Sequence, residues 1–287
     1  MTRYVIITPV RDEEKHVEAT IRSVIGQTIR PAEWVIVDDG STDRTGVIID
    51  QYAAQFPWIR AIHRPNRGLR RASWFDVNAF YEGYNALRCN DWDFVVKLDG
   101  DLSFPADYFE KCFQYFDRDP RLGIGGGDLY INLRGKLTLE VNPRFHVRGA
   151  TKIYRRACWQ AIGGLWVGTG WDTLDEVKAN MLGWKTYSFE DLRLTHLRPT
   201  GAADGKVRAC VRHGLMCYIC GYHPLFVVAS CLYRVIRKPY VVGSLATFWG
   251  FLKAHLNQTS RVNDKPLINY LRTQQLRRLC GLETIWK

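Results

Sequence analysis

Residues 34–43 read WVIVDDGSTD, in which four apolar residues run into two carboxylates, a glycine and a group of small polar residues. Residues 94–101, FVVKLDGD, repeat this order with a lysine inside the apolar run. A continuous apolar run that stops at turn residues predicts a strand covered on both faces. Both stretches therefore predict buried strands of a parallel sheet, with acidic side chains where the strands end.

The segments around these two stretches alternate between strand and helix patterns. Strands are predicted at 4–8, 34–37, 58–63, 94–98 and 185–189, and helices at 17–25, 43–55, 73–87, 105–116, 155–162 and 172–182. Strands separated by helices predict an α/β fold whose parallel sheet is covered on both faces. Because ligands bind such sheets at the carboxyl ends of the strands, the acidic clusters mark the expected site.

The composition is that of a globular protein. The chain has 287 residues, of which 46% are hydrophobic and 24% are charged, so a wholly disordered chain is excluded and a sizeable core is expected. Eight cysteines are scattered along the chain, and the apolar run at 4–8 is too brief for a signal peptide. A reducing, cytoplasmic location with free thiols is expected.

The charge is divided unevenly along the chain. Residues 1–204 hold 27 Lys and Arg and 27 Asp and Glu, whereas residues 205–287 hold 13 and two, so the whole net charge of +11 lies in the last third. This predicts a catalytic domain at 1–204 and a basic C-terminal segment at 205–287. Such a segment suits a polyanion, either a membrane surface or nucleic acid. The charges alternate with apolar runs, which favours a lipid interface.

Residues 214–233 contain no Asp, Glu, Lys or Arg, and their length suits a membrane span. His223 and Pro224 interrupt the stretch, and a second apolar run at 241–252 is too short to cross a bilayer. Three arrangements stay open: a span, helices lying in the lipid interface, and a helical cap packed on the catalytic domain. The interfacial arrangement is preferred.

The carboxylates of Asp99 and Asp101 are separated by one residue. Side chains at this spacing in an extended chain point to the same side. The two carboxylates would repel each other unless a cation lies between them, and Mg²⁺ or Mn²⁺ with oxygen ligands suits that position. Such a pair also occurs as a helix cap, so both interpretations stay open.

Two further acidic clusters suit a binding site. Asp38 and Asp39 can accept hydrogen bonds from a base N–H or a ribose hydroxyl, or can cap the following turn. Asp172, Asp175 and Glu176 open a predicted helix, where acidic side chains also suit the helix dipole. Alternatively, one of them is a general base that reaches an acceptor hydroxyl. Asp172 is the best placed, with Asp175 or Glu176 as the alternative base.

Several short motifs follow one another along residues 3–200. They are TPVRDEE at 8–14, VDDGSTD at 37–43, PNRG at 65–68, LDGD at 98–101, a glycine pair at 163–164, GWDTLDE at 170–176, GWK at 183–185 and TH at 195–196. Their joint order resembles the inverting family 2 glycosyltransferases, of the bacterial, non-processive type. The resemblance implies the GT-A fold, a Rossmann-like and mostly parallel sheet, here with a C-terminal helical extension.

The resemblance also implies roles for individual residues. The nucleotide-diphospho-sugar would be held by Pro9, Arg11, Glu13, Asp38, Asp39, Arg67, Arg71 and Asp99. Asp99 and Asp101 would hold the metal ion, joined in some relatives by a histidine that matches His196. Asp172 would deprotonate the acceptor, with Trp171 and Gly164 on the acceptor side.

The sequence departs from the family pattern at several positions. The usual asparagine of the first motif is Asp12, and the usual Glu-Asp pair is Trp171-Asp172. The Trp171 indole can stack on a sugar face or belong to the core. Residues 275–279, QLRRL, only loosely match the QxxRW motif of processive synthases, which favours the transfer of a single sugar.

The expected function is metal-dependent, inverting transfer of one sugar to a lipid-linked or cell-surface glycan precursor. The expected place is the cytoplasmic face of the cell membrane, with the chain bound peripherally through 205–287 and no nucleic acid as partner. The alternatives are a nucleotidyltransferase on a related sheet and an inactive basic adaptor for membrane or nucleic acid. Residues 8–14 lack the glycine- and lysine-rich phosphate loop of the first alternative, and the intact acidic clusters count against the second.

Overall fold

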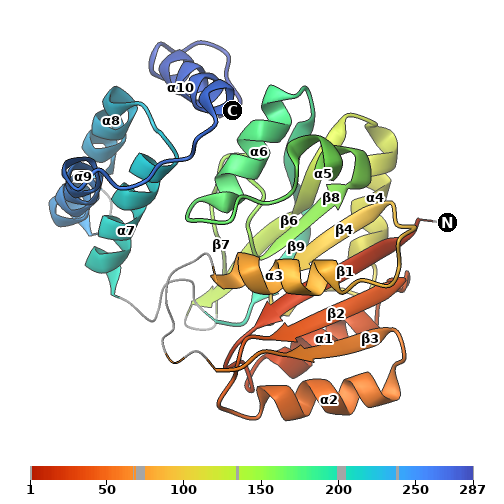
Figure 1. Cartoon of the computed structure of the whole chain (residues 1–287). Coiled ribbons are helices and arrows are strands. Elements are labelled where there is room, and N and C mark those ends of the chain that lie inside the picture. Colours follow the sequence, from red (N-terminus) through yellow and green to blue (C-terminus); the bar gives the residue numbers. More distant parts are fainter. Residues whose placement is uncertain are drawn as a thin grey trace.

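The computed structural model of the chain describes residues 2–66, 68, 75–133, 136–198, 205–236 and 239–286. Its first half contains four parallel strands, β1 (Tyr4–Val10), β2 (Glu33–Asp38), β3 (Ile59–His63) and β4 (Phe94–Leu98). They lie in the order β3-β2-β1-β4 (Figure 1). The predicted parallel sheet is therefore confirmed, and the acidic clusters lie at one edge of it.

The second half of the sheet is mixed. It contains β5 (Leu102–Ser103), β6 (Leu122–Leu133), β7 (Lys136–Leu139), β8 (Thr151–Arg155) and β9 (Lys185–His196). The order continues β4-β8-β6-β9-β5, with β7 on β6, and β8 runs antiparallel to both of its neighbours. Since β6 and β9 are parallel to each other, they point the same way as β4. The carboxyl end of β9 therefore lies on the same side of the sheet as Asp99.

Helices cover both faces of the sheet. They are α1 (Val17–Ile25), α2 (Thr45–Gln55), α3 (Phe75–Asn85), α4 (Tyr108–Arg118), α5 (Arg156–Ile162) and α6 (Trp171–Met181). Successive residues of β1 point to opposite faces. Tyr4 and Ile6 join a core with α1, α2 and α4, and Val5 and Ile7 join a core with α3, α5 and α6. The predicted helices are thus present, with ends shifted by a few residues.

Four helices follow the sheet: α7 (Lys206–Ile219), α8 (Pro224–Arg234), α9 (Tyr240–Leu256) and α10 (Lys265–Leu279). The uncharged stretch 214–233 is divided between α7 and α8, because Pro224 begins a new helix after His223. Among the residues that the structure describes, no helix combines the length and the apolar character needed to cross a bilayer.

The backbones of α7 and α9 touch through glycines. A Cβ atom on Gly214 would lie 1.9 Å from the carbonyl oxygen of Thr247, and one on Gly250 would lie 2.1 Å from that of Val211. Close approach of two helices requires small residues at the crossing. Gly214, the first residue of the uncharged stretch 214–233, is therefore a contact point between two helices.

The C-terminal helices pack on α6. Their common core consists of Leu174 and Val177 from α6 and of Cys220, Val262, Leu267 and Leu271 from the C-terminal segment. Figure 1 shows α7, α8, α9 and α10 together on the α6 side of the sheet. The segment therefore lies against the helix that carries Asp172, as in the arrangement of a helical cap.

Candidate active site

The ends of β1 and β2 place the first acidic cluster. Asp38 ends β2, and its Oδ2 lies 3.1 Å from Nδ1 of His63. Asp39 follows, and its Oδ1 accepts a hydrogen bond from Nη1 of Arg64 at 2.6 Å. Pro9 lies beside them in β1, which pairs with β2. Both carboxylates are buried and held by side chains from the end of β3, so their directions are fixed.

The loop after β1 closes against the loops after β2 and β3. The Arg11 guanidinium donates a hydrogen bond to Oδ1 of Asn66 at 3.1 Å. Asp12, with φ of 52°, accepts one from the backbone N–H of Thr42 at 2.9 Å. Gly40 has φ of 73°, and a Cβ atom there would lie 2.6 Å from Cα of Asn66. Asp12 thus fills the place of the usual asparagine and binds the glycine turn.

A cluster of charges surrounds the second carboxylate of the LDGD motif. Asp101 is buried, with His196 Nε2 at 3.0 Å and Arg198 Nε at 3.4 Å from its Oδ2. Arg198 also pairs with Glu13 at 2.6 Å. Burial alone would raise the pKa of Asp101, but His196 and Arg198 outweigh it and lower this pKa. Asp101 is therefore ionised at neutral pH, and Glu13, from the first motif, belongs to the same site.

The donor set fits a hard divalent cation that arrives with a diphosphate. Asp99 and Asp101 supply two carboxylates at the end of β4, and His196 adds an imidazole. Within the described ranges, no group of three or more His, Cys, Asp and Glu side chains is arranged for a metal ion. Mg²⁺ is commonly bound by one or two carboxylates together with substrate phosphates. The residues present match that mode.

Asp172 lies next to the end of β4. Gly170, with φ of 87°, precedes the first turn of α6, in which Asp172 is half-buried. A Cβ atom on Gly149 would lie 3.4 Å from Cβ of Asp172. The adjoining Ala150 carbonyl accepts a hydrogen bond from the backbone N–H of Asp99 at 2.8 Å. The helix start that carries the predicted base is therefore tied closely to the predicted metal-binding strand end.

The two alternative bases point into the core. Asp175 and Glu176 have fully buried side chains, with Lys152 Nζ 3.0 Å and 2.8 Å from their oxygens. Tyr154 donates a hydrogen bond to Asp175 at 2.6 Å, and His146 Nδ1 lies 2.8 Å from Glu176. Burial raises the pKa of Asp175 to about 6. These contacts argue against the predicted alternative base role of both residues, because neither carboxylate is open to an acceptor hydroxyl.

Trp171 and Gly164, the two residues predicted on the acceptor side, both lie where they contribute to packing. Trp171 is only 6% exposed and packs in the core between the sheet, α3 and α5. Of the two interpretations of the Trp171 indole, stacking on a sugar face or membership of the core, this burial favours the core. Gly164 has φ of 80°, and a Cβ atom there would lie 2.5 Å from the hydroxyl of Tyr81. It permits a tight turn beside α3.

The C-terminal helices pack beside the start of α6, which carries Asp172. Cys220, at the end of α7, has its Sγ 3.8 Å from the carbonyl oxygen of Thr169, just before α6. Burial and the charge of Arg234 lower the pKa of His213 to about 4, against the opposing charge of Asp172. His213 is therefore neutral at physiological pH and lies within electrostatic reach of the base. The sequence did not place this helix at the site.

Two predicted donor-binding residues, Arg67 and Arg71, lie outside the described residues. Three cations that the sequence analysis assigned no role are part of the site: Lys97, Lys152 and Arg198. Lys97 lies inside the apolar strand β4, FVVKL, and a charge in a buried strand needs a partner, so this signal could have identified Lys97. Lys152 lies in β8, TKIYR, whose mixed sequence holds no such signal. For Arg198 the sequence holds no comparable signal.

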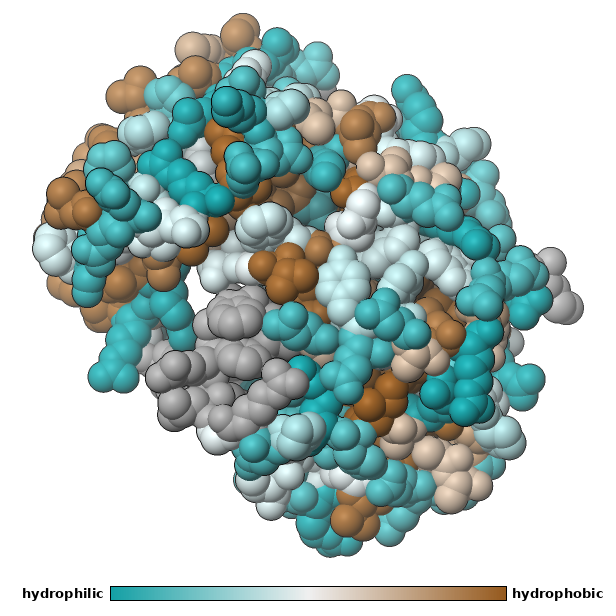
Figure 2. All heavy atoms as spheres, viewed as in Figure 1, coloured by the Kyte–Doolittle hydropathy of each residue, from teal (hydrophilic) through white to brown (hydrophobic). Residues whose placement is uncertain are grey.

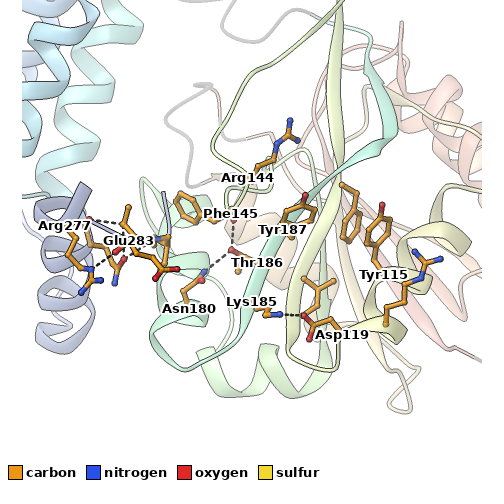
Figure 3. Close-up of a pocket in the computed structure, with 16 residues that line it drawn as sticks. Tyr115, Asp119, Arg144, Phe145, Asn180, Lys185, Thr186, Tyr187, Arg277 and Glu283 are labelled. Carbon is orange, nitrogen blue, oxygen red and sulfur yellow. Dashed lines mark hydrogen bonds and ion pairs between the residues drawn. The ribbon is translucent and has the colours of Figure 1, made fainter. Parts of the chain in front are cut away.

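The structure has a groove of about 770 Å³, whose lining residues are drawn in Figure 3. Its lining includes Lys185 and Leu122, which are the first residues of β9 and β6. The groove therefore lies at the amino ends of these parallel strands, whereas the acidic site lies at their carboxyl ends. Within this lining, Lys185 Nζ donates a hydrogen bond to Oδ2 of Asp119 at 2.5 Å. The groove is therefore separate from the acidic site described above.

Comparison with known proteins identifies the family. The family model described as Glycosyl transferase family 2 matches residues 5–161, more than half of the chain. The chain belongs to this family. Membership of this family supports the expected enzyme class, that of a glycosyltransferase, over the nucleotidyltransferase alternative. The match contains both carboxylates of the LDGD motif and ends before Asp172.

Relatives and solved structures agree with this family. Chondroitin synthase of Escherichia coli is 31% identical over 114 residues, which are 40% of this chain and 15% of that protein. The chain thus matches a small part of this relative's length. The mannosyltransferase PcManGT from Pyrobaculum calidifontis, in complex with GDP-Man and Mn²⁺, has a TM-score of 0.55 at 17% identity over 98% of this chain and 88% of that chain.

A second solved structure has the same fold. It is S. aureus TarS 1-349 in complex with UDP-GlcNAc, with a TM-score of 0.54 at 15% identity over 98% of this chain and 86% of that chain. At such identities the two likenesses establish the fold alone. The predicted GT-A fold with C-terminal helices is confirmed.

Proposed function

We propose that the protein transfers one sugar from a nucleotide-diphospho-sugar to a hydroxyl group, with inversion, and that Asp172 is the general base. The position of Asp172, at a helix start tied to the end of β4, carries this proposal. The Asp172 carboxylate takes the proton of the acceptor hydroxyl. The hydroxyl oxygen then bonds to the anomeric carbon as the bond from that carbon to the diphosphate oxygen breaks, and attack from the opposite face inverts the configuration.

The donor is proposed to bind across the ends of β1 and β2. Asp38 and Asp39 would accept hydrogen bonds from the nucleoside, and their fixed directions suit this role. Pro9, Arg11 and Glu13 would complete the nucleotide site. Support comes from the two solved relatives of the same fold, which hold GDP-Man and UDP-GlcNAc.

Asp99 and Asp101, with His196, are proposed to hold Mg²⁺ or Mn²⁺. When bound, the cation would neutralise the negative charge that develops on the leaving diphosphate. The ionised state of Asp101 supports this role, as does the Mn²⁺ in the mannosyltransferase structure. Arg198 adds a fixed positive charge on the same carboxylate.

Transfer of a single sugar is proposed because the QLRRL segment has a structural role. Gln275 is fully buried in α10, and its Oε1 accepts a hydrogen bond from the backbone N–H of His223 at 2.8 Å. Arg277 and Arg278 donate hydrogen bonds to carbonyl oxygens of the C-terminal tail. All three side chains are therefore engaged within the C-terminal segment itself, which argues against the role of a QxxRW motif that handles a growing polymer.

The acceptor is proposed to be a lipid-linked or cell-surface glycan precursor, reached at the cytoplasmic face of the membrane. Helices α8 and α9 expose a set of large apolar side chains, named here the α8–α9 apolar face: Val228, Leu232, Tyr233, Ile236, Val241, Val242, Leu245, Phe248 and Trp249. Figure 2 shows apolar side chains gathered along the edge where Figure 1 draws these helices. A contiguous set of exposed apolar side chains is typical of a surface that contacts a partner or a membrane, and the basic C-terminal segment would attract anionic lipids.

Calorimetry tests the donor and base assignments. UDP-, GDP- and dTDP-sugars are titrated with Mn²⁺ or with EDTA, into the wild type and into Asp172→Asn. One donor should bind in a metal-dependent manner to both proteins, and only the wild type should transfer the sugar. Asp107→Asn, which alters a carboxylate at the start of α4, should leave transfer unchanged. Failure of every donor to bind in Mn²⁺ would refute the proposal.

A further inference from the structure

We propose that Lys97, Trp171 and Lys152 form one buried unit that fixes the base Asp172 relative to the donor-site carboxylate Asp99. The inference rests on the proposed function. In this unit Trp171 is a positioning residue, which touches neither sugar nor nucleotide. It occupies the place where the family usually has the glutamate of a Glu-Asp pair, so this chain holds its base by another arrangement.

Both ammonium groups lie on the same indole. Lys97 Nζ is 5.3 Å and Lys152 Nζ is 5.5 Å from the centroid of the Trp171 ring. All three side chains are buried. An ammonium group over an aromatic ring is attracted by the quadrupole of the ring, and the attraction is larger away from water. The ring therefore connects two cations that water does not solvate.

Each lysine reaches a different part of the proposed site. Lys97 bonds to the carboxylate of Asp99 and to the carbonyl oxygen of Gly149, the latter at 2.7 Å. Lys152 bonds to the main-chain carbonyl oxygen of Asp172 at 2.5 Å. The Trp171 ring thus links three parts of the proposed site: the carboxylate of Asp99, the backbone at Gly149 and the first turn of α6.

The packing leaves little space for this turn to move. A Cβ atom on Gly149 would lie 3.2 Å from the Trp171 ring and 3.4 Å from Cβ of Asp172. Asp175 and Glu176, which follow this turn in α6, are held by Lys152 as well. The direction of the Asp172 side chain therefore depends on the unit. A misplacement of about 1 Å at a reacting group can cost about 10²-fold in rate.

Steady-state kinetics of three variants test this inference. Trp171→Leu keeps an apolar side chain and removes the ring, and Trp171→Phe keeps an aromatic face. The matched control is Trp92→Leu. Trp92 is also buried, with 7% of its surface exposed, and the guanidinium of Arg156 lies 5.0 Å from its ring. Trp92 precedes β4 and so lies at the end of that strand opposite to Asp99. Trp171→Leu should lower kcat by about 10–100-fold with the donor KM within about threefold. Trp171→Phe should restore most of kcat, and Trp92→Leu should resemble the wild type.

Equal loss of kcat in Trp171→Leu and Trp92→Leu, or a raised KM with unchanged kcat, would overturn the inference. A wild type that transfers no sugar from any donor would instead refute the proposed function. A second measurement does not depend on transfer: the urea unfolding of Trp171→Leu, Lys97→Met and the double variant. If the residues form one unit, the double variant should lose less stability than the sum of the losses in Trp171→Leu and Lys97→Met. The difference should correspond to a factor of about three or more in the unfolding equilibrium constant. Additive losses would also overturn the inference.

Discussion

Replacing Lys152 by methionine should destabilise the protein by about 3–5 kcal/mol, the usual cost of removing one partner of a buried ion pair. Lys152 is fully buried, with Nζ 3.0 Å from Asp175 and 2.8 Å from Glu176. Methionine fills similar space but leaves two buried carboxylates without their cation. For a protein of this size a loss of 1 kcal/mol lowers Tm by about 2–4 °C, so Tm should fall by about 6–20 °C.

The loss of stability in Lys152→Met should increase as the pH rises. Burial already raises the pKa of Asp175 to about 6 in the presence of Lys152, and removal of the cation raises this pKa further. A carboxyl group whose pKa is raised by folding keeps its proton in the folded state after the unfolded chain has lost it. Its contribution to stability is present at low pH and is lost as pH rises through the folded pKa.

The wild type and the variant therefore diverge above pH 6. The wild-type Asp175 is ionised there and adds no further slope, whereas Lys152→Met continues to lose stability as pH rises from 6 to 8. His146 acts with the same sign: burial lowers its pKa, but Glu176 outweighs burial and raises the pKa, so this contribution is also lost as pH rises. The Tm deficit of Lys152→Met should be larger at pH 8 than at pH 5.5.

Thermal unfolding followed by circular dichroism at both pH values measures this deficit. Lys185→Met is the matched control, because Lys185 pairs with Asp119 at 2.5 Å with side chains that are 50% and 32% exposed. Surface pairs contribute little, so the control should shift Tm by about 2 °C or less. A shift of that size in Lys152→Met, or a deficit that is the same at both pH values, would refute the reasoning.

The remaining predictions concern the proposed site and the α8–α9 apolar face. Asp172→Asn should lower kcat by about 10²–10⁴-fold with donor affinity unchanged in calorimetry, and transfer at the wild-type rate would exclude Asp172 as the base. Asp101→Asn should abolish the Mn²⁺-dependent part of donor binding in the same titration, and Mn²⁺-dependent binding that survives would place the metal elsewhere. Leu232→Asp should reduce flotation with anionic vesicles, whereas Leu137→Asp should not; the two side chains are 68% and 54% exposed. Equal flotation of both variants would contradict membrane contact through this face.

Local sequence patterns were sufficient to predict the central elements. The runs WVIV and FVVKL allow no amphipathic helix, and they became β2 and β4. Their carboxylates follow at the strand ends, so Asp38, Asp39, Asp99 and Asp101 could be placed on one side of the sheet before the structure was known. Parallel strands bring their ends together whatever the intervening loops do, which is why this part of the site was predictable.

Long-range contacts account for what the sequence did not predict. Asp172, Asp175 and Glu176 are three acids near the start of one helix, and the sequence does not distinguish them. Lys152, two elements earlier, binds the last two in the core. The ring of Trp171 lies 5.5 Å from the same lysine, a contact that the sequence does not indicate. In the C-terminal segment, the sequence predicted no role for Gly214. Only the position of Thr247 in α9 shows that its missing side chain permits a helix contact.

The buried cluster around Lys152 also explains how one helix start can carry three acids beside a binding site. Three neighbouring carboxylates would raise one another's pKa and repel an anionic donor. The Lys152 ammonium lies within ion-pair distance of both Asp175 and Glu176, and His146 Nδ1 lies 2.8 Å from Glu176, so both carboxylates have partners inside the core. The acidic turn therefore presents a single carboxylate, that of Asp172, while the other two hold the helix to the sheet.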